Sequence, residues 1–167
     1  MNKTIVGVMG PGSEATKKDM EIAKTLGELI AKNNWILLSG GMRKGVMEAV
    51  NISAKKNGGL TLGILPNDDT STHSEELDIS IITNMGAGRN YINAASSHFI
   101  IAIGMSPGTA SEICFAIQLK KNVILLNQNE ESINFFNFLN KGLVHVVENP
   151  YEAIELIKKI KTKQNKK

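Results

Sequence analysis

Residues 98–112 read HFIIAIGMSPGTASE, and this stretch predicts the fold of the chain. Its first six residues are almost wholly apolar, which is typical of a strand that is buried on both faces in a parallel sheet. A glycine-rich turn follows, and the sequence then predicts a helix over 110–120. A buried strand, a glycine turn and a helix, in this order, form the repeating unit of an α/β domain.

The same alternation extends through the rest of the chain. Glycine, asparagine and proline mark most boundaries, and Ser13 is the predicted N-cap of the first helix. The predicted strands lie at 4–9, 35–38, 60–65, 79–83, 98–103, 123–126 and 143–147, and the predicted helices at 14–32, 45–56, 89–97, 110–120, 132–139 and from 150 onward. This order predicts a Rossmann-like three-layer α/β/α domain with a mainly parallel sheet of about seven strands.

Length and composition are those of a globular chain. With 167 residues, 42% of them hydrophobic and 21% charged, we expect a single domain over residues 1–157. No apolar run approaches the ~18 residues of a membrane span, and residues 1–4 run directly into a strand without a secretory signal. The single cysteine, Cys114, excludes an internal disulfide and a zinc cluster. We therefore expect a cytoplasmic protein without a membrane partner.

The net charge of +3 comes from the end of the chain. The last ten residues hold six of the 19 basic residues and no acidic one, so the rest carries 13 basic and 16 acidic residues. We expect residues 158–167 to form a lysine-rich, disordered tail. A nucleic-acid-binding domain carries its basic residues on a folded face. Two tyrosines and one tryptophan also offer little surface for stacking bases, so nucleic acid is not an expected partner.

Four glycine-rich turns follow predicted strands, and parallel sheets bind ligands at these carboxyl ends. The first turn contains the candidate ligand-binding residues Gly10, Gly12 and Ser13. It lacks the G-x-G-x-x-G spacing of a dinucleotide site, so NAD is not predicted.

The second turn contains the candidates Gly40, Gly41, Met42 and Gly45. Two of these glycines have the spacing of a P-loop. However, Val46-Met47 stand where that motif needs a lysine and a hydroxyl residue, which excludes a P-loop ATPase.

The third turn places an arginine at the start of a short helix. Met85 and Gly86 precede Arg89, and Asn90 follows it. A cation at a helix N-terminus opposes the helix dipole. Its presence favours a functional role, such as binding a phosphate with the guanidinium fork, and a solvated surface arginine is the alternative.

The fourth turn opens the helix of the quoted stretch. Its candidate ligand-binding residues are Gly104, Ser106, Pro107, Gly108, Thr109 and Ala110. Free amide groups from 108 to 111 and the Thr109 hydroxyl would suit a phosphate. The spacing of Thr109 and Glu112 also fits a capping box, in which Glu112 only bonds back to the Thr109 amide.

These motifs resemble those of the LOG-like ("lonely guy") family of Rossmann-like nucleotide-binding proteins. Gly108, Thr109 and Glu112 match the G-T-x-x-E end of its hallmark P-G-G-x-G-T-x-x-E. A second signature, G-G-x-x-x-G-x-M-x-A followed by G-G-x-x-x-G-x-x-P, is matched over 40–49 and 58–66. The similarity extends to about residue 126, and the chain looks closest to the branch that includes molybdenum-cofactor-carrier-like proteins.

The resemblance implies that Arg89 and Glu112 match the catalytic pair of phosphoribohydrolases. These enzymes cleave the N-glycosidic bond of a cytokinin nucleoside 5′-monophosphate and release the base and ribose 5-phosphate. Glu112 would then stay ionised near the helix N-terminus and stabilise positive charge on the sugar. The resemblance also implies a homodimer or larger assembly that forms through helices beside the site, and no cofactor or metal ion is expected.

Departures from the family pattern leave a second hypothesis open. Gly104-Met105-Ser106 stand where the hallmark has P-G-G, and Asn90 replaces the lysine of the family's M-H-x-R-K motif. The chain is therefore either a hydrolase or a non-catalytic carrier of a nucleotide or of the phosphorylated pterin of molybdenum cofactor. Both hypotheses share a phosphorylated small-molecule ligand.

The remaining polar residues favour structural roles. His73, His98 and His145 are scattered along the sequence, and residues 67–78 form an acidic stretch typical of a mobile lid or a solvated loop. Met42, Met47 and Met85 are candidates for a pocket lining, although methionine more often fills gaps in a core.

Overall fold

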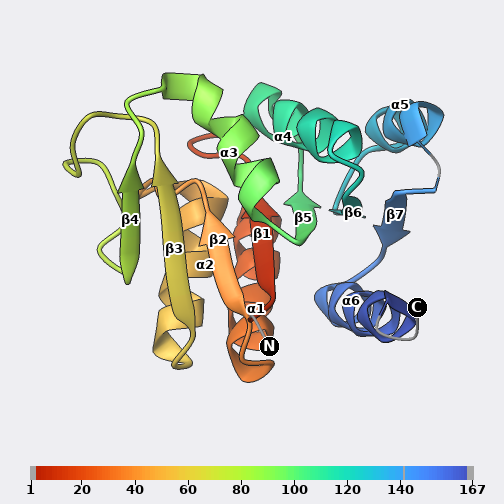
Figure 1. Ribbon diagram of the computed structural model, residues 1–167, viewed down its shortest axis with the longest axis horizontal. Helices are drawn as coiled ribbons and strands as arrows, with labels where there is room; N and C mark the ends of the chain where they lie inside the picture. The colour runs from red at the N-terminus through yellow and green to blue at the C-terminus, as the bar shows by residue number, and fades with distance from the viewer. Residues whose placement is uncertain (1–2, 141, 165–167) are drawn as a thin grey trace.

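The computed structural model describes residues 3–140 and 142–164, and one seven-stranded sheet runs through them (Figure 1). All neighbouring strands pair in parallel. In sheet order the strands are β4 (Ile79–Ile82), β3 (Leu60–Leu65), β2 (Ile36–Ser39), β1 (Ile5–Met9), β5 (Phe99–Ile103), β6 (Asn122–Leu126) and β7 (Val144–Val147). The predicted Rossmann-like α/β fold is confirmed.

Helices cover both faces of the sheet and complete the three layers (Figure 1). One core cluster lies between the sheet and α1, α2 and α6, and a second lies between the sheet and α3, α4 and α5. The bounds are α1 (Lys17–Lys32), α2 (Gly45–Lys56), α3 (Arg89–Ser96), α4 (Pro107–Gln118), α5 (Glu130–Asn140) and α6 (Pro150–Gln164), with a 3₁₀ turn, η1 (Gly86–Gly88), before α3. All five residues of β5 are buried, as its apolar sequence predicts.

The order of the strands reverses at β1. From β1 the chain winds outward through β2, β3 and β4, then crosses back to β5 on the other side of β1. The loops after β1 and β5 therefore leave the sheet in opposite directions, and a crevice opens between them. This crevice lies at the end of the sheet where the predicted glycine turns gather.

The acidic stretch at 67–78 is attached to the second glycine turn. The amide of Ser74 donates to the carbonyl of Gly41 at 2.8 Å, and Met42 and His73 form a β-bridge. Arg43 forms an ion pair with Glu75 at 2.6 Å. These contacts hold the stretch beside the turn, so a freely solvated loop is not what the structure shows.

The first helix begins later than predicted. Its N-cap is Thr16, not Ser13, and the hydroxyl of Thr16 accepts a hydrogen bond from the amide of Asp19 while the Asp19 carboxylate accepts from the amide of Thr16. This capping box outweighs a single serine because it satisfies two amides at once. Ser13 is left in the loop, facing the crevice.

The last helix continues into the predicted tail. α6 extends to Gln164, so residues 158–164 are helical and not disordered, while 165–167 lie outside the described residues. Ile157 is fully buried and Ile160 packs against the same core cluster. The ammonium of Lys161 lies 5.2 Å from the centre of the Trp35 ring. The helix persists because one face is apolar, even though its other face is rich in lysine.

Among the described residues, no helix is both long and apolar enough to cross a lipid bilayer.

Two glycines with left-handed backbone conformation provide a matched test of the contact between the loops after β1 and β2. Gly45 and Gly58 have φ of +53° and +74°, but a Cβ at Gly45 would clash with the carbonyl oxygens of Gly12 and Pro11, whereas one at Gly58 meets nothing within 4 Å. Gly58→Ala should lower the free energy of unfolding by about 1–2 kcal/mol through backbone strain alone. Gly45→Ala should cost a further ~1–3 kcal/mol from the clash. Urea denaturation of both variants measures the difference, and equal losses would show that the loops are not in contact.

Candidate functional site

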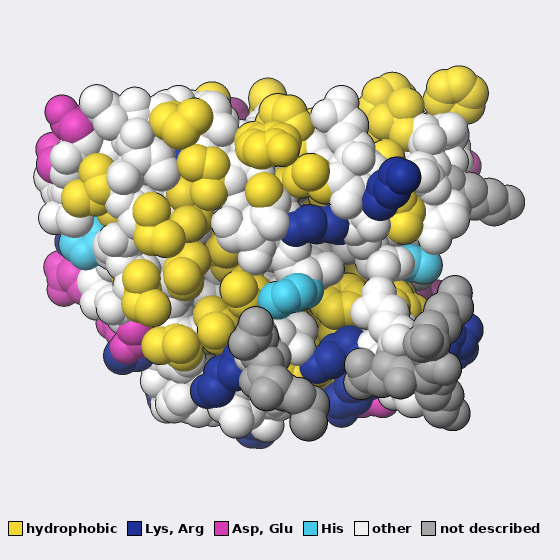
Figure 2. All heavy atoms as spheres, in the orientation of Figure 1, with side chains coloured by type: hydrophobic (Ala, Val, Ile, Leu, Met, Phe, Trp, Pro, Cys, Tyr) yellow, Lys and Arg dark blue, Asp and Glu magenta, His cyan; other side chains and the backbone are white. Residues whose placement is uncertain are grey.

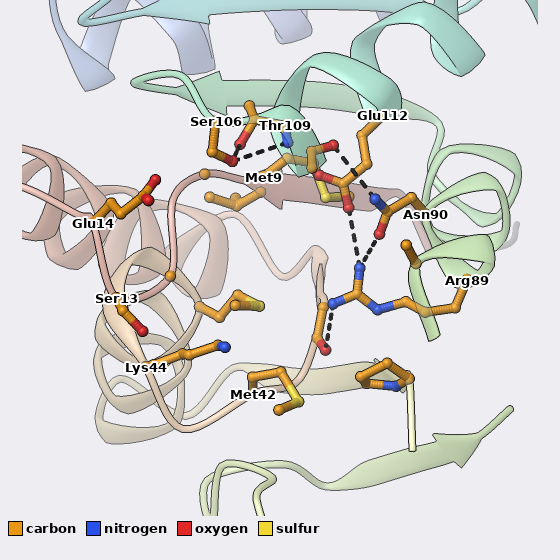
Figure 3. A pocket seen from close by; sticks show the side chains of 18 of the residues that line it. Met9, Ser13, Glu14, Met42, Lys44, Arg89, Asn90, Ser106, Thr109 and Glu112 are labelled. Atoms are coloured by element: carbon orange, nitrogen blue, oxygen red, sulfur yellow. Dashed lines mark hydrogen bonds and ion pairs between the residues drawn. The ribbon is translucent and has the colours of Figure 1, made fainter. Parts of the chain in front are cut away.

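A cavity of about 410 Å³ opens at the carboxyl ends of β1, β2 and β5. Residues from β1, from the loops that follow β1, β2, β3, β4 and β5, and from α2, α3 and α4 line it (Figure 3). The lining consists of Val8, Met9, Gly10, Gly12, Ser13, Glu14, Gly40, Met42, Lys44, Met47, Pro66, Gly86, Ala87, Arg89, Asn90, Ser106, Gly108, Thr109 and Glu112. All four glycine turns of the sequence therefore meet at one cavity.

Most of the predicted site residues line this cavity. They are Gly10, Gly12, Ser13, Gly40, Met42, Gly86, Arg89, Asn90, Ser106, Gly108, Thr109 and Glu112. The agreement follows from the topology, because parallel strands bring their following turns to one edge of the sheet.

Six predicted residues lie outside the lining: Gly41, Gly45, Met85, Gly104, Pro107 and Ala110. Gly41 and Gly45 have positive φ and allow close backbone contacts, and a Cβ at Gly104 would lie 2.8 Å from the Asp19 carboxylate. Pro107 is the first residue of α4, and Ala110 packs against the core. Conformational and packing roles account for these five residues, and the sixth, Met85, is exposed.

Sequence reasoning missed several lining residues: Val8, Met9, Glu14, Lys44, Pro66 and Ala87. Val8 and Met9 belong to β1 and carry no signal of function. Lys44 does carry one, because it lies within the second glycine turn, next to Gly45. Of the three methionines that were candidates for a pocket lining, Met42 and Met47 do line the cavity, whereas Met85 does not.

The guanidinium of Arg89 lies in the cavity wall, where it contacts three groups of the protein. Its Nη1 donates to Oδ1 of Asn90 and lies 3.6 Å from Oε1 of Glu112, and its Nη2 donates to the carbonyl of Gly40 at 3.3 Å (Figure 3). The side chain is 11% exposed. The alternative of a solvated surface arginine is therefore wrong.

Glu112 faces Arg89 from the second turn of α4, with its side chain 7% exposed. Its Oε1 also accepts a hydrogen bond of 2.7 Å from the side-chain Nδ2 of Asn93 in α3. Burial raises the pKa of Glu112 to about 7, against the lowering effects of Asn93 and Arg89. The expectation that the helix N-terminus keeps this carboxyl ionised is thus wrong, because the free amides lie one turn away and burial dominates.

The capping-box hypothesis for Thr109 and Glu112 is also wrong. The N-cap of α4 is Ser106, whose hydroxyl accepts from the Thr109 amide at 3.2 Å. The Ala110 amide donates to the Ser106 carbonyl at 2.8 Å. The chain itself thus satisfies two of the amides that were candidates for a phosphate cradle, and Glu112 is left to face the cavity.

Asn90 connects the two helices beside this pair. Its amide group donates to Oγ of Ser111 at 2.8 Å, while its carbonyl oxygen accepts from Arg89. A neutral amide can serve both contacts at once, since it has a donor and an acceptor, whereas a lysine at this position has donors only. The replacement of the family's lysine by Asn90 therefore adds a structural link between α3 and α4.

Among the described residues, no cluster of three or more His, Cys, Asp or Glu side chains is placed to hold a metal ion. The cavity instead combines an apolar floor with a few polar groups, which is the usual composition of a small-molecule site.

Comparison with known proteins identifies the family. The model of the SLOG cluster4 family, part of the LOG-like superfamily, matches residues 3–154. The chain belongs to the SLOG cluster4 family.

Relatives of this SLOG cluster4 chain include proteins of known structure. A molybdenum cofactor binding protein from the phototrophic bacterium Rippkaea orientalis is 47% identical, with a TM-score of 0.94 over 96% of this chain and 98% of its own. The molybdenum cofactor carrier protein of Chlamydomonas reinhardtii is 44% identical, with a TM-score of 0.92 over 96% and 99%. An uncharacterised protein of Archaeoglobus fulgidus is 41% identical over 121 residues, which cover 72% of this chain and 78% of the relative.

The buried carboxyl of Glu112 predicts a pH dependence of stability. Its pKa rises from 4.5 to about 7 on folding, so the folded state binds an extra proton between these values. The free energy of unfolding should therefore fall as the pH rises from 5 to 8, by up to about 3 kcal/mol from this group.

Glu112→Gln removes this dependence while preserving the shape of the side chain. The free energy of unfolding is measured by denaturant for the wild type and the variant at pH 5, 6, 7 and 8. As the pH rises, the wild type should lose the contribution of Glu112 and the variant should not, so the variant becomes more stable relative to the wild type. A constant offset is expected as well, because Arg89 loses its partner. Parallel profiles over this range would contradict the raised pKa.

Proposed function

We propose that this SLOG cluster4 protein binds molybdenum cofactor, a phosphorylated pterin, in the cavity and carries it without converting it. The observation that carries the proposal is the match in fold and sequence to two proteins described as binding or carrying this cofactor, at 47% and 44% identity over 96% of the chain. The cavity of about 410 Å³ is within the range of small-molecule sites.

The lining of the cavity suits a flat, polar ring with an anionic substituent. Met9, Met42 and Met47 offer polarisable apolar surface for a ring. Hydroxyl and amide groups lie around them, including Ser13 and Ser106. Such a combination holds a heterocycle by contact and orients it with a few hydrogen bonds.

The cavity can be blocked at a glycine that tolerates a side chain. A Cβ at Gly108 would lie 3.7 Å from Nδ2 of Asn90 and 3.8 Å from Oγ of Ser106, so a larger side chain there would extend among lining residues. Gly108→Leu should lower the amount of bound pterin at least about tenfold, since the side chain occupies ligand space. Protein is purified without oxygen from cells that make the cofactor, and the oxidised pterin is measured by fluorescence.

Gly88→Leu is the matched control. Gly88 lies outside the lining, and a Cβ there would meet only Met85, at 3.6 Å. The control should retain the wild-type pterin content, and both variants should unfold at the wild-type temperature. A wild type that carries no pterin would refute the proposed function.

A second candidate function is hydrolysis of a nucleoside 5′-monophosphate. It is favoured by one observation, namely that Arg89 and Glu112, the pair implied by the resemblance, both line the cavity. Release of free base and ribose 5-phosphate from a panel of nucleoside monophosphates would support it, provided that Glu112→Gln abolishes the release. Binding without release is the result expected of a carrier.

We also propose that two copies of this chain pair through the open edge of the sheet. β4 is the edge strand, and Ile79, Ile81 and Ile82 are each more than 40% exposed. Figure 2 shows hydrophobic side chains gathered over β4 and α3. Tyr91 of α3 is also exposed. The strand has no charged residue or proline to prevent pairing, and these are the usual protections of an edge in a monomer. A second copy of this chain is the proposed occupant.

Ile81→Glu should disrupt this assembly, because a charge would be buried in the interface. Ile52→Glu is the matched control, since Ile52 on α2 is 44% exposed and Ile81 is 42% exposed. Light scattering coupled to size exclusion should show a dimer or larger assembly for the wild type and the control, and a smaller species for Ile81→Glu. A monomeric wild type would refute the pairing.

A further inference from the structure

The four charged side chains of the cavity lining are not equally available to a ligand. Arg89 and Glu112 form an ion pair with each other at 3.6 Å. The two terminal nitrogens of Arg89 also donate to Asn90 and Gly40, and its Nε is buried. The positive charge of Arg89 is therefore paired within the wall, and both of its terminal nitrogens already donate to the protein.

Lys44 is the second cation of the lining, and it has no such partner. Within residues 3–140 and 142–164 its ammonium forms no ion pair and no hydrogen bond. In Figure 3 its side chain extends into the cavity, on the wall opposite Glu112 and Asn90. The ammonium is thus free to bind an anionic group.

The backbone around Lys44 supports this position. A Cβ at Gly12 would lie 3.0 Å from Cε and 3.2 Å from Cδ of Lys44, so a glycine at position 12 leaves room for the lysine stem. Lys44 is also the N-cap of α2, where its side chain makes no capping bond. A cation at this end opposes the helix dipole, and no acidic side chain in the described residues compensates for it within ion-pair distance.

Unused amide groups lie on the same wall. Among the described residues, the N–H groups of Gly12, Ser13 and Glu14 form no hydrogen bond with the chain. By contrast, the amides of Thr109 and Ala110 across the cavity already donate to Ser106. On the side of Lys44 three successive amides are therefore free to turn to a ligand, whereas two amides in the first turn of α4 are already occupied.

We propose that Lys44 and the amides of Gly12–Glu14 form the subsite for the phosphate of the ligand, and that Arg89 positions Glu112 instead of binding the anion. This assignment rests on the proposed function, because it names the part of the same cavity that holds the charged group. It places the phosphate at the turns after β1 and β2, at the opposite wall from the hallmark motif after β5.

Glu14 also lines the cavity and carries a negative charge. In Figure 3 its carboxylate extends toward Ser106 and away from the ammonium of Lys44, and no ion pair joins the two. The subsite therefore needs Lys44 to outweigh Glu14, which makes binding of an anion sensitive to the loss of this one cation.

The test compares each phosphorylated probe with its dephosphorylated form, using the full chain. The probes are a phosphorylated pterin and the same pterin after phosphatase treatment, and AMP and adenosine, with dissociation constants measured by calorimetry. Lys44→Met should weaken binding of the phosphorylated probes about tenfold or more and leave the dephosphorylated probes within about twofold. Lys44→Arg should retain most of the affinity, because it restores the charge.

Lys56→Met is the matched control. Lys56 is an exposed lysine in the last turn of the same helix, so it changes the net charge equally and should leave all affinities unchanged. Arg89→Met should lower stability and affect both members of each probe pair alike, as expected of a positioning residue.

The outcomes separate the inference from the proposed function. Phosphate selectivity that survives Lys44→Met, or that is lost in Arg89→Met alone, overturns the inference while the carrier function stands. A wild type that binds AMP but no pterin overturns the carrier function, and the role of Lys44 is then decided with AMP and adenosine. A wild type that binds neither pair overturns both.

Discussion

A buried pair of opposite charges organises the wall of the cavity. The side chains of Arg89 and Glu112 are 11% and 7% exposed, so each charge is stabilised by the other and hardly by water. Removing one partner of such a pair typically costs about 3–5 kcal/mol, because the other charge stays buried alone. Since Arg89 begins α3 and Glu112 lies in α4, the pair also joins the helices that follow β4 and β5. The positions of these two helices are therefore coupled to the electrostatics of the site.

The glycine turns are explained in part by this close packing. A Cβ at Gly40 would lie within contact distance of the Arg89 guanidinium and of Met47, and one at Gly10 would press on Val46 and on the carbonyl of Ile103. These glycines are required by contacts within the protein, before any ligand is considered. A glycine-rich edge in a parallel sheet thus shows where loops converge, and the chemistry of the site has to come from the side chains that converge with them.

The sequence allowed the order of strands and helices, and the edge of the sheet that holds the cavity, to be predicted correctly. Both depend on local hydrophobic patterning and on the general topology of parallel sheets. The protonation of Glu112 was predicted wrongly, because it depends on burial between α3 and α4, which spacing along the chain does not reveal. Lys44 was overlooked for a related reason. Its free ammonium matters only because Arg89, which is 45 positions away, is already paired.

The state of the charged pair bears on whether the site carries a ligand or cleaves one. A carboxylate that stabilises positive charge on a sugar has to be ionised, whereas the general acid of the same reaction is protonated and has a raised pKa. Here burial raises the pKa of Glu112 to about 7, which brings its protonated and ionised forms into balance near neutral pH. While Glu112 is ionised it balances Arg89, so Lys44 and Glu14 are the remaining charges of the lining that a ligand meets. Binding of an anion beside the pair favours the protonated carboxyl, so we expect ligand binding and the protonation of Glu112 to be coupled.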